Sequence, residues 1–76
     1  SFDTHLSIDT DNRKGITIDI LNELSKANVF LVRMSVASVK YSGRIRLTFK
    51  AFRKNQVEKI LMNIKQIDGV REVRKQ

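Results

Sequence analysis

Two segments of this chain carry apolar residues at helical spacing along one side only, and this feature constrains the fold most. In the first segment the apolar positions are Ile16, Ile20, Leu21, Leu24 and Ala27. In the second they are Val57, Ile60, Leu61, Ile64 and Ile67, followed by Asp68-Gly69. A helix with one apolar stripe must bury it against another element, and a glycine after the stripe is a common helix stop. We predict one helix from Ile16 to near Asn28 and a second after Asn55 that ends before Gly69.

Four other segments have the composition and alternation of β-strands: residues 4–10, 29–40, 44–52 and 70–75. The third alternates most regularly, with apolar side chains at Ile45, Leu47 and Phe49 and polar ones between them. A period of two places such an apolar set on one face of a sheet. Tyr41-Ser42-Gly43 contains a glycine that can adopt a positive φ, which predicts a hairpin turn there. In the second strand the predicted shared face comprises Phe30, Val32, Met34 and Val36.

The order of these elements is strand, helix, strand, strand, helix, strand. One antiparallel sheet with both helices on one face buries both stripes, and right-handed crossovers select the ferredoxin-like arrangement. The predicted fold class is α+β, a ferredoxin-like βαββαβ sandwich whose first and third strands are central in a four-stranded sheet. The other face of the sheet is then open, and the third strand presents a polar row there, Arg44, Arg46, Thr48 and Lys50.

The length of 76 residues allows one domain, residues 1–76, which buries only roughly 60% of the surface that its unfolded chain exposes. Without cysteine, no disulfide or thiolate metal site can add stability, so we expect no metal, no cofactor, and a role for self-association. The apolar runs are far shorter than the roughly 20 residues that cross a bilayer. We expect a cytoplasmic protein without membrane contact. Because the chain opens with Ser1-Phe2, we also expect it to be part of a larger protein.

The charge of the chain is unevenly distributed, although the total is +7. Residues 1–28 carry three basic and five acidic side chains, whereas residues 29–76 carry twelve and three. A strongly basic surface is typical of proteins that bind anionic partners, RNA above all, although solvated basic faces also occur without one. The candidates for contact with RNA or a partner are Lys40, Arg44, Arg46, Lys50 and Arg53.

Two motifs resemble the ACT domain family, and the resemblance covers nearly the whole chain. Residues 12–20, N-R-K-G-I-T-I-D-I, resemble the ACT stretch D-R-x-G-L-L-x-D-I. Residues 64–73 resemble the ACT ending L-x-x-I-x-G-V-x-x-V. These segments and the helix exit Ala27-Asn28-Val29 are most similar to the C-terminal domain of the GTP pyrophosphokinases, which make and degrade (p)ppGpp in the stringent response. The chain departs from the pattern at Asn12, where Asp is usual, and at Thr17, where an apolar residue is usual.

The resemblance implies a regulatory dimer that binds a small amino acid at the loop after the first strand. The matching positions here are Asn12, Arg13, Gly15 and Ile16. A helix N-terminus beside a glycine presents free N–H groups that suit a carboxylate. The alternative is that Gly15 only makes the turn and Asn12 only caps the helix. In the alarmone enzymes, the resemblance further implies contact with ribosomal RNA or other domains that shifts the balance of distant catalytic sites.

Catalysis by this domain has little support in the sequence. It contains one histidine, His5, no cysteine, and no carboxylate cluster in a loop that would pair with a nucleophile. Two hypotheses remain, a ligand-sensing regulatory dimer and a docking module for ribosomal RNA or a partner domain; an ACT domain of an amino-acid metabolic enzyme is a further alternative. The second strand, apolar on both faces at Leu31 and Val39, is the predicted contact for a dimer or a parent domain.

Overall fold

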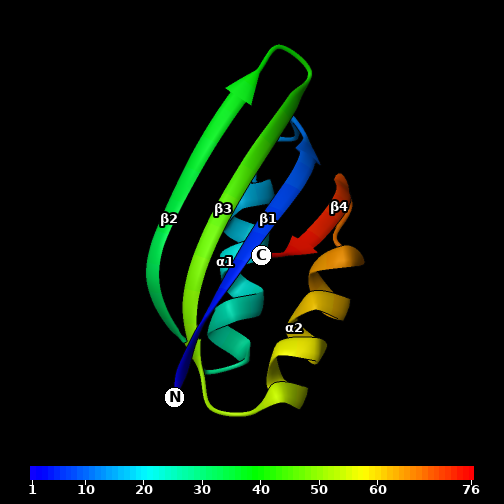
Figure 1. Ribbon diagram of the computed structural model, residues 1–76. Helices are drawn as coiled ribbons and strands as arrows, with labels where there is room; N and C mark the ends of the chain where they lie inside the picture. The colour runs from blue at the N-terminus through cyan, green and yellow to red at the C-terminus, as the bar shows by residue number, and fades with distance from the viewer.

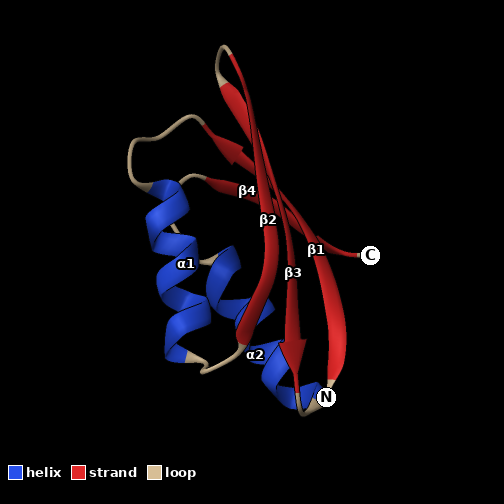
Figure 2. Cartoon of the chain, turned by 90° about the vertical axis from the view of Figure 1, so that its left-hand side faces the viewer, coloured by secondary structure: helices blue, strands red, loops and turns tan.

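The computed structural model describes all 76 residues, and its elements follow the predicted order (Figure 1). The strands are β1 (Phe2–Asp11), β2 (Phe30–Val39), β3 (Ser42–Ala51) and β4 (Val70–Lys75), and the helices are α1 (Ile16–Lys26) and α2 (Lys54–Lys65). Neighbouring strands are antiparallel in the order β2-β3-β1-β4. Both helices lie on one face of the sheet (Figure 2). The predicted α+β, ferredoxin-like sandwich is confirmed.

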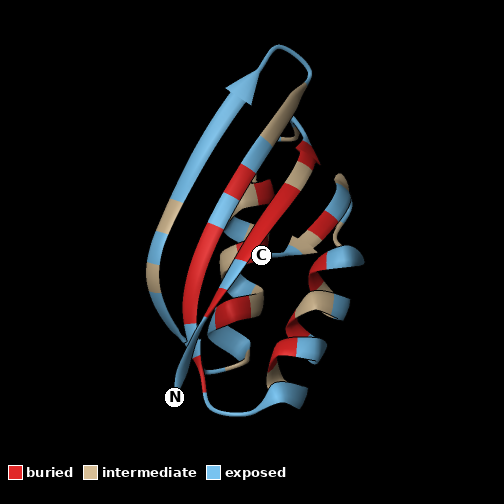
Figure 3. Cartoon of the chain, in the orientation of Figure 1, coloured by how far each residue is buried: buried red, intermediate tan, exposed pale blue.

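The core lies between the sheet and the helices, and the alternating rows of the central strands build it. Ile45, Leu47 and Phe49 of β3 are each at most 1% exposed. The helices bury the predicted stripes against them, chiefly through Ile16, Ile20, Leu24, Val57, Ile60 and Ile64. Figure 3 shows that burial is concentrated on β1, β3 and the inner sides of the helices, while β2 stays largely exposed. The core therefore depends on the two central strands, and β2 is a lightly covered edge.

The hairpin between β2 and β3 turns earlier than predicted. Its turn residues are Lys40 and Tyr41, and the positive φ falls on Lys40, at 22°, and not on Gly43. Gly43 lies within β3, where a Cβ would come within 3.0 Å of the Thr10 Oγ1 atom. The absence of a side chain at Gly43 is therefore explained by the close approach of Thr10, not by the turn.

A β-bulge in β2 corrects the predicted face of its first residues. The register with β3 shifts between Leu31 and Arg33. Downstream of the bulge, Met34 lies on the helix side, packed against the core. Upstream, Phe30 pairs with Lys50 on the open face. The prediction that Phe30 and Met34 share a face is wrong, because one extra residue in the strand reverses the alternation.

The predicted polar row of β3 is on the open face, but one member is not exposed. Thr48 is only 5% exposed, and its hydroxyl hydrogen-bonds the ring of His5 on β1, with 2.8 Å between Oγ1 and Nδ1. Arg44, Arg46 and Lys50 are exposed as predicted. The sheet face away from the helices is therefore exposed at Arg44, Arg46 and Lys50 and covered at Thr48.

Candidate ligand loop and basic sheet face

The loop between β1 and α1 brings three of the four predicted ligand positions to the surface. Gly15, at φ 83°, is the N-cap residue of α1 and is partly exposed. Ile16 follows it, but its side chain is 6% exposed and belongs to the core. Among the first backbone N–H groups of α1, that of Ile16 donates to the Arg13 carbonyl, while those of Thr17 and Ile18 have no backbone acceptor. The start of α1 can thus offer a ligand the free backbone donors of Thr17 and Ile18, whereas the buried side chain of Ile16 is not available to it.

All three guanidinium nitrogens of Arg13 donate hydrogen bonds within the chain. Its Nε donates to the carbonyl of Asp68 (2.8 Å), one terminal nitrogen to the carbonyl of Lys14 (3.1 Å), and the other to the Asp19 carboxylate (2.7 Å). Asp68 lies in the turn before β4, and Asp19 lies in α1. Arg13 therefore connects the ligand loop to the first helix and to the α2–β4 turn.

Asn12 does not cap α1. Its amide nitrogen lies 3.4 Å from the carbonyl oxygen of Lys40, and its Oδ1 accepts a hydrogen bond from Ser38 (3.3 Å). No side chain caps the helix at Gly15. The alternative that Asn12 is a helix cap is wrong, because its side chain reaches across to the β2–β3 hairpin instead.

A shallow cavity of about 310 Å³ lies beside the loop. It is lined by Arg13, by Ile67 and Asp68 of the α2–β4 turn, and by polar residues of α1 that include Asp19. The loop is therefore accessible from the side of α1, next to the link that Arg13 makes between elements.

The five predicted contact residues of the basic face do not form one cluster. Arg44 pairs with Asp9 (2.8 Å), and Lys50 pairs with Asp3 (3.1 Å). Lys40 lies in the hairpin turn, and Arg53 is the N-cap residue of α2, after the far end of β3. Of these five residues, only Arg46 both lies on the open face and makes no ion pair.

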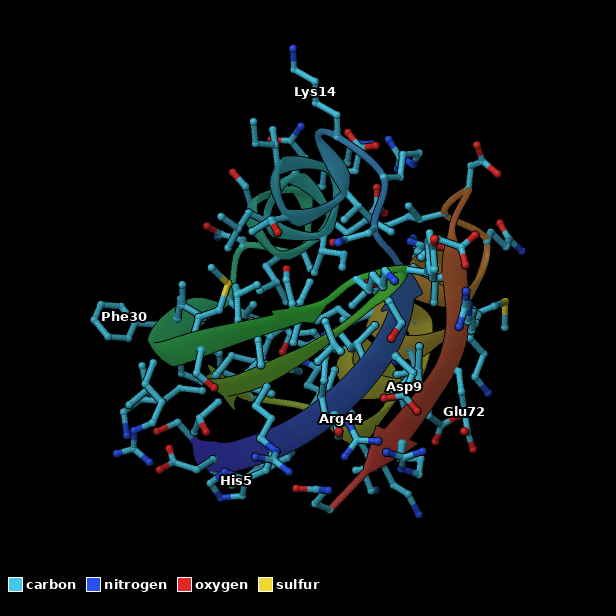
Figure 4. The ribbon with its side chains drawn as sticks, turned by 90° about the horizontal axis from the view of Figure 1, so that it is seen from above. His5, Asp9, Lys14, Phe30, Arg44 and Glu72 are labelled. Carbon is cyan, nitrogen blue, oxygen red and sulfur yellow. The ribbon has the colours of Figure 1, made fainter.

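Asp9 forms ion pairs with two arginines on this face. It accepts from Arg44 and from Arg74, the latter over 3.1 Å. The hydrogen bond from Arg44, with a weaker contribution from Arg74, lowers the pKa of the Asp9 carboxyl below its ordinary value of 3.8. Asp9 in turn raises the pKa of Arg44. Figure 4 shows His5, Asp9, Arg44 and Glu72 together on the sheet face that points away from α1.

The sequence did not single out two residues that the structure places beside Arg46. Arg33 of β2 and His5 of β1 line the same cavity as Arg46. The signal for them lies in the strand register, which aligns His5 and Arg33 with Thr48. This register depends on the bulge in β2, which the sequence pattern does not reveal.

The family model for the ACT domain matches residues 1–74. The chain belongs to the ACT domain family. No curated protein sequence matches it significantly.

Solved structures of several proteins are similar to this ACT domain over nearly its whole length. The ACT domain from the GTP pyrophosphokinase of Chlorobium tepidum superposes with a TM-score of 0.89 at 15% identity, covering 99% of this chain and 97% of that one. The acetolactate synthase small subunit of Thermotoga maritima gives 0.82 at 14% identity, covering 99% and 47%. A homoserine dehydrogenase from Thiobacillus denitrificans gives 0.75 at 18% identity, covering 97% and 17%. At these identities the likeness establishes the fold.

The β2 edge of the ACT domain carries large apolar side chains in contact with solvent. Phe30 is 66% exposed, Val36 50% and Val39 71%. The opposite edge, β4, is shorter and carries mainly charged residues. No helix of the chain is long and apolar enough to span a membrane. The apolar edge strand β2 is therefore the sheet edge at which we expect contact with another chain or domain.

Proposed function

We propose that this chain is the regulatory ACT domain of a stringent-response GTP pyrophosphokinase, where it senses an amino acid and relays its binding to distant catalytic sites of a longer protein. The observation that carries the proposal is the near-complete mutual coverage with the ACT domain of the Chlorobium enzyme. The two motifs at residues 12–20 and 64–73 support the same parent enzyme. The domain itself performs no chemistry in this role.

The proposed ligand site is the loop of Asn12, Arg13, Gly15 and Ile16, to which Thr17 and Ile18 add their backbone N–H groups. These two donors lie at the positive end of the α1 dipole, which favours a carboxylate. The side chain of Ile16 points into the core, so a second subunit is needed to enclose the apolar part of an amino acid. We propose that this subunit is another copy of the domain, joined at the β2 edge.

The link made by Arg13 supplies a route from the ligand to the rest of the domain. A carboxylate bound at the start of α1 competes with Asp19 for the Arg13 guanidinium, which is also bonded to the turn before β4. A change in that bond shifts the position of β4 relative to α1. In the longer protein, this shift is the signal that reaches neighbouring domains.

Isothermal titration calorimetry with branched-chain and small amino acids tests the ligand proposal. Each amino acid is paired with its amide, for example valine with valinamide, because the amide lacks the carboxylate that the free N–H groups would bind. We expect heat from at least one amino acid, none from its amide, and NMR shifts concentrated at residues 15–18. Silence across the whole panel would leave docking as the role of the domain.

Two other functions remain candidates, each on its own observation. Docking to ribosomal RNA is favoured by the exposed Lys40, Arg46 and Arg53, and a steep fall of RNA affinity with rising salt is its expected signature. Regulation of an amino-acid metabolic enzyme is favoured by the structural likeness to acetolactate synthase and homoserine dehydrogenase. The coding sequence upstream of this segment decides between parents, because an alarmone enzyme carries a nucleotidyltransferase domain and a metal-dependent hydrolase domain there.

A further inference from the structure

The charges on the open sheet face lie in rows that run across the strands. In one row Arg44 lies between Ala37 and Asp9, and Asp9 is followed by Glu72 on β4. Arg74, from the adjacent row, reaches both carboxylates, at 3.1 Å to Asp9 and 2.8 Å to Glu72. The arginines at this end of the face are therefore neutralised by carboxylates of the same chain.

Two other arginines on the face have no such partner. Arg46 is flanked by Ser35 on β2 and Ser7 on β1, and Arg33 lies opposite Thr48. This register makes Arg33 and Arg46 diagonal neighbours on one face. At that spacing long side chains can reach one another. Neither guanidinium forms an ion pair or a side-chain hydrogen bond within the chain. Two adjacent cations without a counter-charge repel each other and favour an anion between them.

A cavity of about 310 Å³ lies over these two arginines. His5, Ser35 and Thr48 line it together with them. The hydrogen bond between His5 Nδ1 and the nearly buried Thr48 hydroxyl fixes the imidazole and leaves Nε2 as its second polar atom. The cavity thus combines two arginine forks, an imidazole nitrogen and the Ser35 hydroxyl.

We propose that this cavity binds the phosphate or pyrophosphate group of a small molecule, held by Arg33 and Arg46 with His5 and Ser35 as further hydrogen-bond partners. Guanidinium groups match phosphate oxygens in geometry and bind them through paired N–H donors. The site lies on the face opposite the helices and does not depend on the amino-acid site in the loop after β1. It is a second ligand site on the same domain.

The distribution of carboxylates favours a compact anion over a nucleic-acid strand. Asp9 and Glu72 lie beyond Arg46 at one end of the face, and Asp3 lies beyond Arg33 at the other, paired with Lys50. A polyanion that continued past the cavity in either direction would meet these carboxylates. A single phosphate or pyrophosphate group fits between them without repulsion.

NMR titration of the chain with inorganic pyrophosphate, at constant ionic strength, tests this site. We expect saturable shifts of the His5, Arg33 and Arg46 amides. Arg33→Gln and Arg46→Gln should each raise the dissociation constant for pyrophosphate by about tenfold, the effect typical of losing hydrogen bonds to a charged group. The matched control, Lys59→Gln, removes the same charge from α2 and should change it by less than about twofold. Circular dichroism checks that each variant is folded.

Two results would overturn the proposal. One is equal weakening in Lys59→Gln and in the two arginine variants, which would mean attraction to net charge alone. The other is binding of single-stranded oligouridylate without binding of pyrophosphate, which would make the face an RNA-docking surface. Failure of the amino-acid titration is independent, because its shifts are expected at residues 15–18 on the opposite side of the sheet.

Discussion

Asp9 is the residue at which the electrostatics of the sheet face make a prediction about stability. Because Arg44 and Arg74 lower its pKa in the folded state below 3.8, Asp9 stabilises the fold above that pH, and this contribution is lost as the pH falls through the lowered value. Asp9→Asn should therefore reduce the free energy of unfolding at pH 7 and flatten its decline as the pH falls below 3.8. Urea denaturation across this range measures both effects. Glu58→Gln, an exposed carboxylate without an ion pair, is the control, and an unchanged acid limb in Asp9→Asn contradicts the prediction.

Gly69 and Gly15 allow a second prediction at the scale of single residues. Both adopt positive φ, 94° and 83°, where a Cβ is strained by roughly 1–2 kcal/mol. At Gly69 the Cβ would also come within 3.0 Å of the Ile16 Cδ1 atom, whereas at Gly15 the nearest atom is 3.9 Å away. Gly69→Ala should therefore destabilise the domain more than Gly15→Ala, measured by urea denaturation. Equal losses would mean that backbone strain alone accounts for both glycines.

At the scale of elements, the predictable parts are those in which one face is clearly apolar. The alternation of β3 and the stripes of α1 and α2 specify which side is buried, and the structure follows them. β2 is different, since both of its faces are rich in apolar residues and a shift of one residue costs little burial. The sequence pattern therefore does not predict the bulge after Leu31. For the same reason it does not predict that Arg33 and Arg46 are neighbours on one face.

In the candidate ligand loop, the local sequence predicts the backbone but not the tertiary contacts of the side chains. The spacing of Gly15 and Ile16 predicts a glycine turn into a helix, which the structure has. What the pattern lacks is the tertiary partner of each polar side chain. Arg13 binds a carbonyl 55 residues away in sequence, and Asn12 binds the hairpin 28 residues away. Such partners follow from the closed topology and not from local sequence.

At the scale of the whole molecule, the unequal edges of the sheet predict how two copies would meet. The β2 edge is ten residues long with one charged residue, Arg33, whereas β4 has six residues and four charged side chains. Exposed apolar edges favour strand pairing and charged ones oppose it. Two copies should therefore join through β2, which continues the sheet across the interface and brings the two α1 helices to the same side.

Val36→Lys tests this arrangement, because it places a charge in the middle of β2 at a position that is 50% exposed. Light scattering after size exclusion should give about twice the 8.8 kDa chain mass for the unmodified domain and a single chain mass for Val36→Lys. Met62→Lys, an equally non-conservative change at an exposed apolar position of α2, should remain dimeric. If Val36→Lys stays dimeric while Met62→Lys dissociates, the helical layer and not the sheet edge forms the interface. The enclosed amino-acid site at Gly15 would then have to be completed from the side of α2.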